Sequence, residues 1–139
     1  MAPGGHVLIR AVTADAVRPL RLRVLRPNQT MADTVHLAAF DGDRVVGIGS
    51  LYREDRAGGP VGGWRLRGMA TEPDVRGRGY GAGVLSASVD RVAAAGGTEL
   101  WCNAREAAIG FYRRAGFDVV SEPFDVPGIG AHVVMARPV

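Results

Sequence analysis

Two hydrophobic runs rich in β-branched residues lie on either side of a short polar tripeptide in residues 34–55, TVHLAAFDGDRVVGIGSLYRED. The tripeptide is Asp41-Gly42-Asp43, and an Asp-Gly pair between such runs is a strong short-range sign of a β-hairpin. The stretch therefore predicts two antiparallel strands. Residues 54–63 follow as a turn-rich connection, and residues 63–73, GWRLRGMATEP, predict a third strand.

Residues 79–97, GYGAGVLSASVDRVAAAGG, change the spacing of hydrophobic positions from that of a strand to that of a helix. Gly96 and Gly97 are the expected stop, because glycine readily takes the left-handed conformation that ends helices. Residues 105–116, REAAIGFYRRAG, predict a shorter helix that ends at Gly116. The face expected to be buried on the longer helix consists of Val84, Leu85, Val89, Val92 and Ala93.

The remaining segments complete one mixed sheet. Strands are expected in HVLIRAV near the N-terminus, in TELWCNA, and in two final segments, FDVVSEPF and AHVVMARPV. A helix with Thr13 as its N-cap is expected after the first strand, although Pro19 disfavours its middle. Strands interleaved with helices predict an α/β fold, a mixed parallel and antiparallel central sheet flanked by helices. With 139 residues, the chain is expected to be a single domain, 1–139.

Composition narrows the class of protein. No run approaches the roughly 18 apolar residues of a membrane helix, and the N-terminal residues lack the basic and apolar regions of a secretory signal. A cytoplasmic protein without a membrane partner is expected. The only cysteine, Cys102, lies in the apolar stretch ELWCNA without metal-ligand spacing around it, so we expect a small buried core residue and no metal site.

The chain has a net charge of +3, and all 17 of its Lys and Arg positions are arginine. Guanidinium groups suit phosphate or carboxylate ligands. The arginines are dispersed and do not alternate with aromatic residues, so no nucleic-acid partner is expected.

The stretch VRGRGYGAG, residues 75–83, is the most specific signal in the chain. A flexible loop is one interpretation, but it does not explain why an amphipathic helix begins inside the cluster. Gly77, Gly79 and Ala82 satisfy the dinucleotide-binding pattern G-x-G-x-x-G/A. That pattern should follow its strand at once, near the start of a βαβ unit, and here EPDVR intervenes. A Walker loop is excluded because Gly-Lys-Ser/Thr is absent.

An anion site at a helix start is the remaining interpretation. Glycines let successive backbone N–H groups turn toward one point, and the helix N-terminus adds partial positive charge there. Arg76 and Arg78 supply full charges. This combination fits a diphosphate held mainly by main-chain donors, where any Cβ would hinder close approach.

Together with two further segments, this stretch makes the sequence resemble the GNAT acetyltransferase superfamily. MATEPDVRGRGYGAG is similar to its signature R/Q-x-x-G-x-G/A, with Arg76, Gly79 and Gly81 in the fixed positions. REAAIGFYRRAGF resembles the family's A-x-x-F/L-Y-x-x-x-G-F segment, in the expected order along the chain. The tail EPFDVPGIGAHVVM further resembles the ElaA-like branch, with Ala131 before His132 where proline is more familiar.

The resemblance implies an acetyl-CoA-dependent N-acetyltransferase that transfers the acetyl group directly to an amine in a ternary complex. It implies a bulge near Gly68 in the strand before the glycines, pairing of the pantetheine arm with that strand, and a main-chain N–H near Met69 that faces the thioester oxygen. The residues expected to bind acetyl-CoA are Met69, Ala70, Thr71, Arg76, Gly77, Arg78, Gly79, Tyr80, Gly81 and Asn103.

The resemblance makes Tyr112 the expected general acid for the departing thiolate. The residues alone favour a core role for Tyr112, on an apolar helix face with Ala108, Phe111 and Ala115. Many family members carry asparagine where this chain has Arg105. In place of the contact made by that asparagine, Arg105 is expected to cap a helix or to reach a phosphate.

Three residues are candidates for a general base: His36, Glu72 and His132. A histidine in an apolar strand such as His36 is more often structural, whereas His132 matches the ElaA-like tail. The amine acceptor is expected beside RPNQT and PFDVPGIGAH. Trp64 fits a role in packing and a role in acceptor specificity equally well. A homodimer is left open. The competing classes are a non-catalytic acyl-CoA-binding domain and, more distantly, a nucleotide-dependent oxidoreductase.

Overall fold

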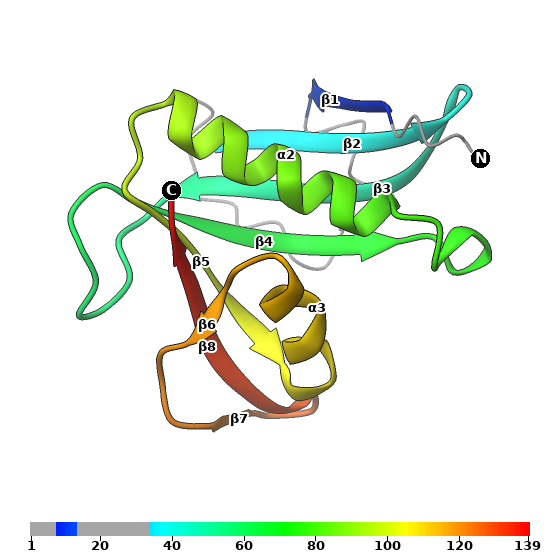
Figure 1. Ribbon diagram of the computed structural model, residues 1–139. Coiled ribbons are helices and arrows are strands. Elements are labelled where there is room, and N and C mark those ends of the chain that lie inside the picture. The colour runs from blue at the N-terminus through cyan, green and yellow to red at the C-terminus, as the bar shows by residue number, and fades with distance from the viewer. Residues whose placement is uncertain (1–7, 14–33) are drawn as a thin grey trace. The chain divides into compact units, whose positions relative to one another are not determined.

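The computed structural model of the protein describes residues 8–13 and 34–139 (Figure 1). The helix expected after the first strand and the acceptor segment RPNQT lie outside these residues. The chain divides into two compact units. Unit 1 takes its described residues from Met1–Tyr52 and Arg67–Ser88, and unit 2 consists of Arg53–Leu66 and Val89–Val139.

Unit 1 contains a meander of antiparallel strands. Strand β1 (Leu8–Val12) pairs with β2 (Thr34–Asp41), and β2 pairs with β3 (Arg44–Arg53) up to the closing pair Asp41↔Arg44. The predicted hairpin is confirmed, with Gly42 at φ +62° in its turn, a conformation that glycine adopts without strain. The register shifts between the pairs Ala39↔Gly47 and Phe40↔Val45, which makes Val46 of β3 the extra residue of a bulge.

Strand β4 (Gly63–Thr71), the short 3₁₀ helix η2 (Pro73–Val75) and helix α2 (Tyr80–Ala94) follow in the predicted order. Helix α2 buries Val84, Leu85 and Val92 as predicted, but the prediction for Ala93 is wrong because this residue is exposed. Ser88 is buried instead, and its hydroxyl donates to the backbone oxygen of Val84 at 2.7 Å. A buried hydroxyl is tolerated where it has such a partner.

The predicted stop of α2 is confirmed at Gly96 and Gly97. Gly96 has φ +78°, and the N–H of Gly97 donates to the oxygen of Val92 at 2.9 Å. This bond satisfies a carbonyl group that the last helical turn leaves without an intrahelical donor. Among the described residues, no helix is long and apolar enough to span a membrane.

Unit 2 contains both kinds of strand pairing. The beginning of β4 pairs in parallel with β5 (Glu99–Arg105), from Gly63↔Glu99 to Arg65↔Trp101. Strand β5 pairs antiparallel with β8 (Gly130–Pro138), and β6 (Asp118–Val119) and β7 (Phe124–Val126) both pair with β8. The predicted mixed α/β sheet is therefore confirmed.

The prediction of one strand over residues 117–124 is wrong, because β6 and β7 are separate elements. Between them, the hydroxyl oxygen of Ser121 accepts the N–H of Val134 at 2.8 Å, in place of a backbone carbonyl. Pro123 has no N–H to give to a ladder. Together these residues interrupt the pairing with β8.

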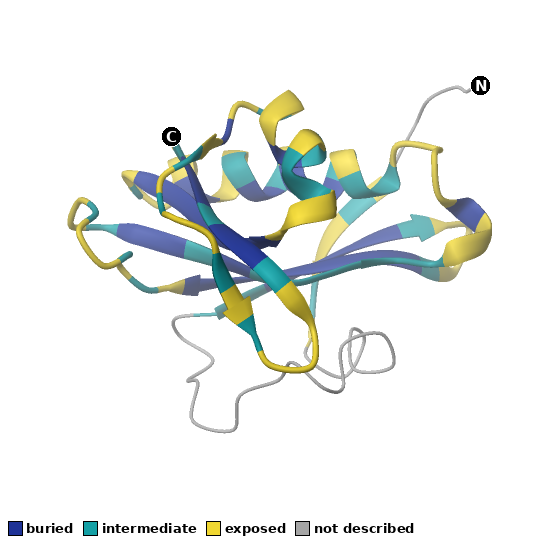
Figure 2. Ribbon diagram, turned by 90° about the horizontal axis from the view of Figure 1, so that it is seen from below, coloured by how far each residue is buried: buried dark blue, intermediate teal, exposed yellow. Residues whose placement is uncertain are grey.

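The second predicted helix begins as a 3₁₀ turn, η3 (Glu106–Ala108), and continues as α3 (Ile109–Arg114), which lies beside β5 (Figure 1). It ends where predicted, with Gly116 at φ +91°. In both units the strands carry most of the buried residues, and the connecting loops are exposed (Figure 2). Cys102 is buried in unit 2, as predicted.

Candidate active site

The glycine loop, residues 76–81, runs from the end of η2 into the first two residues of α2, within unit 1. Arg76 has an extended backbone, and Gly77 and Gly79 have φ of +82° and +88°, in the left-handed region that residues with a side chain rarely adopt. A Cβ built on either glycine would meet no atom within 4 Å. The two glycines are therefore required by backbone conformation and not by crowding from the protein.

Helix α2 begins at the end of this loop. The N–H of Gly83 donates to the oxygen of Gly79 at 2.9 Å, the i to i−4 bond that opens the helix. In such a helix start the N–H groups of the preceding residues have no intrahelical acceptor. Arg76 and Arg78 are exposed beside them. The loop thus places backbone donors, the positive end of a helix dipole and two guanidinium groups in one segment of unit 1.

The strand segment before the loop also has an irregular backbone. Gly68, inside β4, has φ +66°, the left-handed conformation found at one type of β-bulge. Met69, Ala70 and Thr71 follow as half-buried residues. The N–H of Glu72 donates to the oxygen of Val46 at 2.8 Å, which ties the end of this segment to β3.

Tyr112 lies on α3 in unit 2 with 7% of its surface exposed. Its ring meets those of Phe111 and Phe117 edge-on, with centroids 5.1 and 5.5 Å away. Burial, followed by the neighbouring Cys102, raises the pKa of the Tyr112 phenol well above its ordinary value. The phenol is therefore protonated at physiological pH and can donate a hydrogen bond.

His132 is buried at the start of β8, where its ring stacks on that of Phe124 with centroids 5.9 Å apart. Its Nδ1 lies 2.9 Å from the backbone oxygen of Gly130. A carbonyl oxygen only accepts, so Nδ1 carries a proton, and in the neutral imidazole the lone pair is on Nε2. The surroundings thus leave Nε2 as the nitrogen able to accept a proton.

The other two base candidates have different environments. His36 is buried in β2, and its Nδ1 lies 2.8 Å from the hydroxyl oxygen of Ser50, which supports a structural role. Glu72 accepts a hydrogen bond from Arg44 at 3.1 Å. The Glu72 carboxylate is thus engaged in an ion pair, which supports a structural role.

Asn103 and Arg105 are both exposed near the end of β5. Arg105 occupies the N-cap position of η3, but its side chain makes no capping hydrogen bond.

The segment PFDVPGIGAH, expected beside the amine acceptor, forms the β7–β8 hairpin, in which Ile129 is 54% exposed. Trp64 is buried, and the guanidinium of Arg53 lies 5.3 Å from its ring, so packing explains this residue.

Sequence reasoning missed Arg44, because its partners Glu72 and Asp74 lie 28 and 30 residues away and no local pattern connects them.

The predicted site residues fall into two groups. Unit 1 brings together the end of β4 and the glycine loop, and unit 2 holds Asn103, Tyr112 and His132. The described residues contain no group of three or more His, Cys, Asp or Glu side chains arranged to hold a metal ion.

Comparison with known proteins gives a consistent result. The model of the acetyltransferase (GNAT) family matches residues 9–117. A protein of Bacillus subtilis (strain 168), described as the uncharacterized N-acetyltransferase YitI, is 30% identical over 143 residues, which cover 93% of this chain and 94% of that protein.

Solved structures share the fold. The crystal structure of Escherichia coli ElaA superposes with a TM-score of 0.77 at 16% identity, over 95% of this chain and 99% of that one. An aminoglycoside 6'-N-acetyltransferase complexed with coenzyme A gives a TM-score of 0.73 at 15% identity, over 94% and 96% of the two chains.

Proposed function

Because the chain belongs to the acetyltransferase (GNAT) family, we propose that it is an N-acetyltransferase that moves an acetyl group from acetyl-CoA directly to the nitrogen of an amine. The acceptor is a small amine or an exposed amine of a protein. The reaction takes place in a ternary complex, without a covalent acetyl-enzyme.

The glycine loop carries this proposal. Its two left-handed glycines and the start of α2 form a segment rich in backbone donors, and Arg76 and Arg78 add charge. A diphosphate is the ligand class that such a segment suits best. We assign Arg76, Gly77, Arg78, Gly79, Tyr80 and Gly81 to the diphosphate of acetyl-CoA.

The end of β4 and the end of β5 supply the remaining cosubstrate contacts in this proposal. The backbone of Met69, Ala70 and Thr71 pairs with the pantetheine arm, and Asn103 hydrogen-bonds its amides. The left-handed Gly68 supports this assignment, because a bulge removes nearby backbone groups from the regular ladder. The N–H near Met69 faces the thioester oxygen, where it stabilises the developing negative charge.

The chemical step needs one nucleophile and two proton transfers. The lone pair of a neutral amine attacks the thioester carbonyl, the new C–N bond forms and the C–S bond breaks. The CoA thiolate leaves and takes the proton of the Tyr112 phenol. The proton lost by the acetylated nitrogen passes to His132 Nε2, directly or through water.

Burial affects Tyr112 in two opposing ways. It keeps the phenol protonated, but it also raises the pKa of Tyr112, which makes the phenol a weaker acid. The same surroundings raise the pKa of the Cys102 thiol to about 12. A CoA thiolate that departs beside Tyr112 is expected to become more basic for the same reason, which offsets part of the weaker acidity of the phenol.

A panel of amines, incubated with the protein and acetyl-CoA, tests the proposed activity through release of free thiol and through the mass of the acetylated product. The expected result is thiol release that requires an amine and yields equimolar product. The competing function is a non-catalytic acyl-CoA-binding domain, which the core-like packing of Tyr112 favours. Tight binding of acetyl-CoA without turnover of a wide amine panel would support that alternative.

A further inference from the structure

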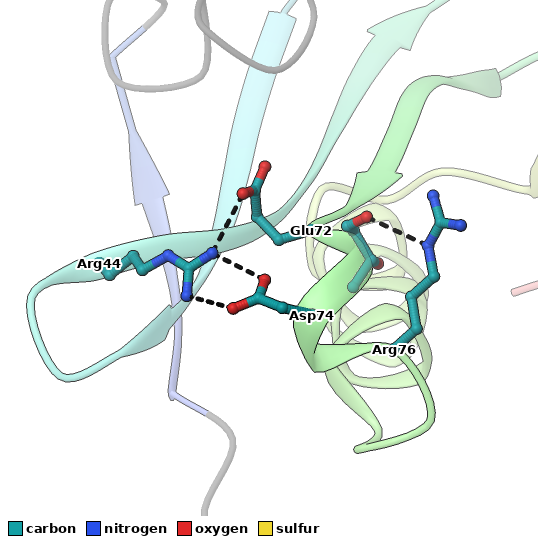
Figure 3. A network of polar contacts seen from close by, with 5 residues as sticks. Arg44, Glu72, Asp74 and Arg76 are labelled. Atoms are coloured by element: carbon teal, nitrogen blue, oxygen red, sulfur yellow. Dashed lines mark hydrogen bonds and ion pairs between the residues drawn. The ribbon is translucent and has the colours of Figure 1, made fainter.

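Arg44 connects two parts of unit 1 that are distant in the sequence (Figure 3). It lies at the start of β3, directly after the hairpin turn. Its Nη1 and Nη2 donate to the two carboxylate oxygens of Asp74, both at 2.8 Å, and Nη2 also donates to Glu72 at 3.1 Å. One guanidinium thus holds both acidic residues that flank Pro73.

The contacts form a more ordered arrangement than an isolated surface ion pair. Two parallel N–H···O bonds to one carboxylate fix the orientation of both groups, and the third bond adds a second acidic partner. The hydrogen bonds from Arg44 also hold the pKa of the Asp74 carboxyl below its usual value. Because all three side chains are partly exposed, the interaction is expected to weaken as the salt concentration rises.

The location of this network gives it a consequence for the glycine loop. Asp74 lies within η2, and η2 leads directly into residues 76–81. A Cβ at Gly77 or Gly79 would meet no atom within 4 Å, so packing at these two positions does not hold the loop. Within the loop, Arg76 Nε donates to the backbone oxygen of Thr71 at 3.4 Å. The segments at the two ends of the loop are the other constraints on its conformation. One end is helix α2, and the other is η2, held by the buried Val75 and by Arg44.

We propose that Arg44 is a positioning residue for the cosubstrate, which holds η2 against the β2–β3 hairpin and so keeps the glycine loop in the conformation that binds the CoA diphosphate. This inference rests on the proposed function. In this proposal Arg44 itself does not contact CoA.

A purely electrostatic role makes a different prediction, and the two can be separated. Glu72 and Asp74 repel a nearby diphosphate, so neutralising either one should strengthen CoA binding if charge alone matters. If Arg44 positions η2, then Asp74→Asn should weaken CoA binding despite the loss of a negative charge, because it removes the bidentate ion pair.

Calorimetric titration with CoA tests the inference on four proteins: the wild type, Arg44→Ala, Asp74→Asn and the charge swap Arg44→Asp with Asp74→Arg. The expected Kd is about two- to tenfold higher in both single variants. The swap should recover part of this loss, because Arg at position 74 can pair with Asp at 44 and with Glu72. Arg91→Ala, an exposed position on α2, controls for the loss of one positive charge.

Steady-state kinetics add a readout that a general loss of stability would not reproduce. The expected change in Arg44→Ala is a higher KM for acetyl-CoA, with kcat and the KM of the amine nearly unchanged. If Arg44→Ala does not fold, Asp74→Asn and the swap carry the test. Unchanged or tighter CoA binding by Asp74→Asn would overturn the positioning role. If the wild type itself did not bind CoA, the proposed function would fail before this inference was reached.

Discussion

His132 Nδ1 donates its proton to the backbone oxygen of Gly130 at 2.9 Å, and this bond leaves Nε2 as the basic nitrogen of the ring. Both residues belong to the β7–β8 hairpin, so the backbone turn that places Gly130 also fixes the histidine tautomer. The stacked ring of Phe124 limits rotation of the imidazole. A base with a fixed lone pair is more effective than one that must first reorient.

His132→Asn separates this role from packing. The asparagine amide can keep the hydrogen bond to Gly130, because its Nδ2 is attached at the same position as Nδ1, but it has no equivalent of Nε2. We expect kcat to fall about 100-fold while the melting temperature and CoA affinity change little. A kcat equal to that of the wild type would exclude His132 as the base.

Tyr112→Phe retains the aromatic ring and its edge contacts with Phe111 and Phe117. It removes only the hydroxyl, so CoA affinity is expected to stay within about twofold, and kcat to fall about 100-fold or more. Because the pKa of Tyr112 is raised, the loss should extend across the whole neutral pH range. Wild-type turnover of a verified amine by this variant would show that Tyr112 is a core residue only.

The buried Cys102 thiol is expected to make the folded protein less stable at alkaline pH. Burial raises its pKa from 9.0 to about 12 in the folded protein. A group with a raised folded-state pKa stabilises the fold below its unfolded-state value, and this contribution is lost as pH rises through the window between the two values. From pH 9 upward, the free energy of unfolding should decrease by up to about 1.4 kcal/mol per pH unit.

Urea denaturation at pH 8, 9 and 10 measures this slope. Cys102→Ala should be less stable at pH 8, because it leaves a small cavity, but its stability should change less between pH 9 and 10. The buried Tyr112 phenol, whose pKa is raised from 10.0, adds its own loss of stability only as the pH approaches and passes 10. Parallel curves for the two proteins would show that Cys102 does not carry the alkaline loss.

Gly79→Val tests whether the glycine loop binds the cosubstrate. At φ +88° a β-branched residue is strained, so the variant should lose about 1–2 kcal/mol of stability and bind CoA at least about tenfold more weakly. Gly58→Val is the matched control, since Gly58 has φ +77° with equally open surroundings but lies in the connection between β3 and β4. Equal CoA affinities of the two variants would argue against the loop as the diphosphate site.

The sequence predicted features that depend on local backbone chemistry. The hairpin at Asp41-Gly42-Asp43 and the helix stops at Gly96 and Gly116 follow from residues that favour one turn or one helix end. The glycine loop was predictable for the same reason, because its pattern joins a conformational requirement to a helix start.

Features that depend on side-chain partners were not predictable. Ser88 is buried because a hydroxyl that bonds to its own helix can enter the core, whereas Ala93 is exposed. The break between β6 and β7 depends on Ser121, which accepts a backbone N–H from β8. The ion pairs of Arg44 join positions about 30 residues apart. No periodicity or short motif encodes contacts of this kind.

Calorimetric titration of the full chain with acetyl-CoA, with NADPH and ATP as controls, decides whether the protein binds an acyl-CoA. We expect saturable binding of acetyl-CoA with one site per chain and a micromolar Kd, and no binding of NADPH or ATP at the same concentrations. Failure of the folded protein to bind acetyl-CoA would contradict it. The segment VRGRGYGAG would then be a loop, and both the enzyme and the acyl-CoA-binding domain would be excluded.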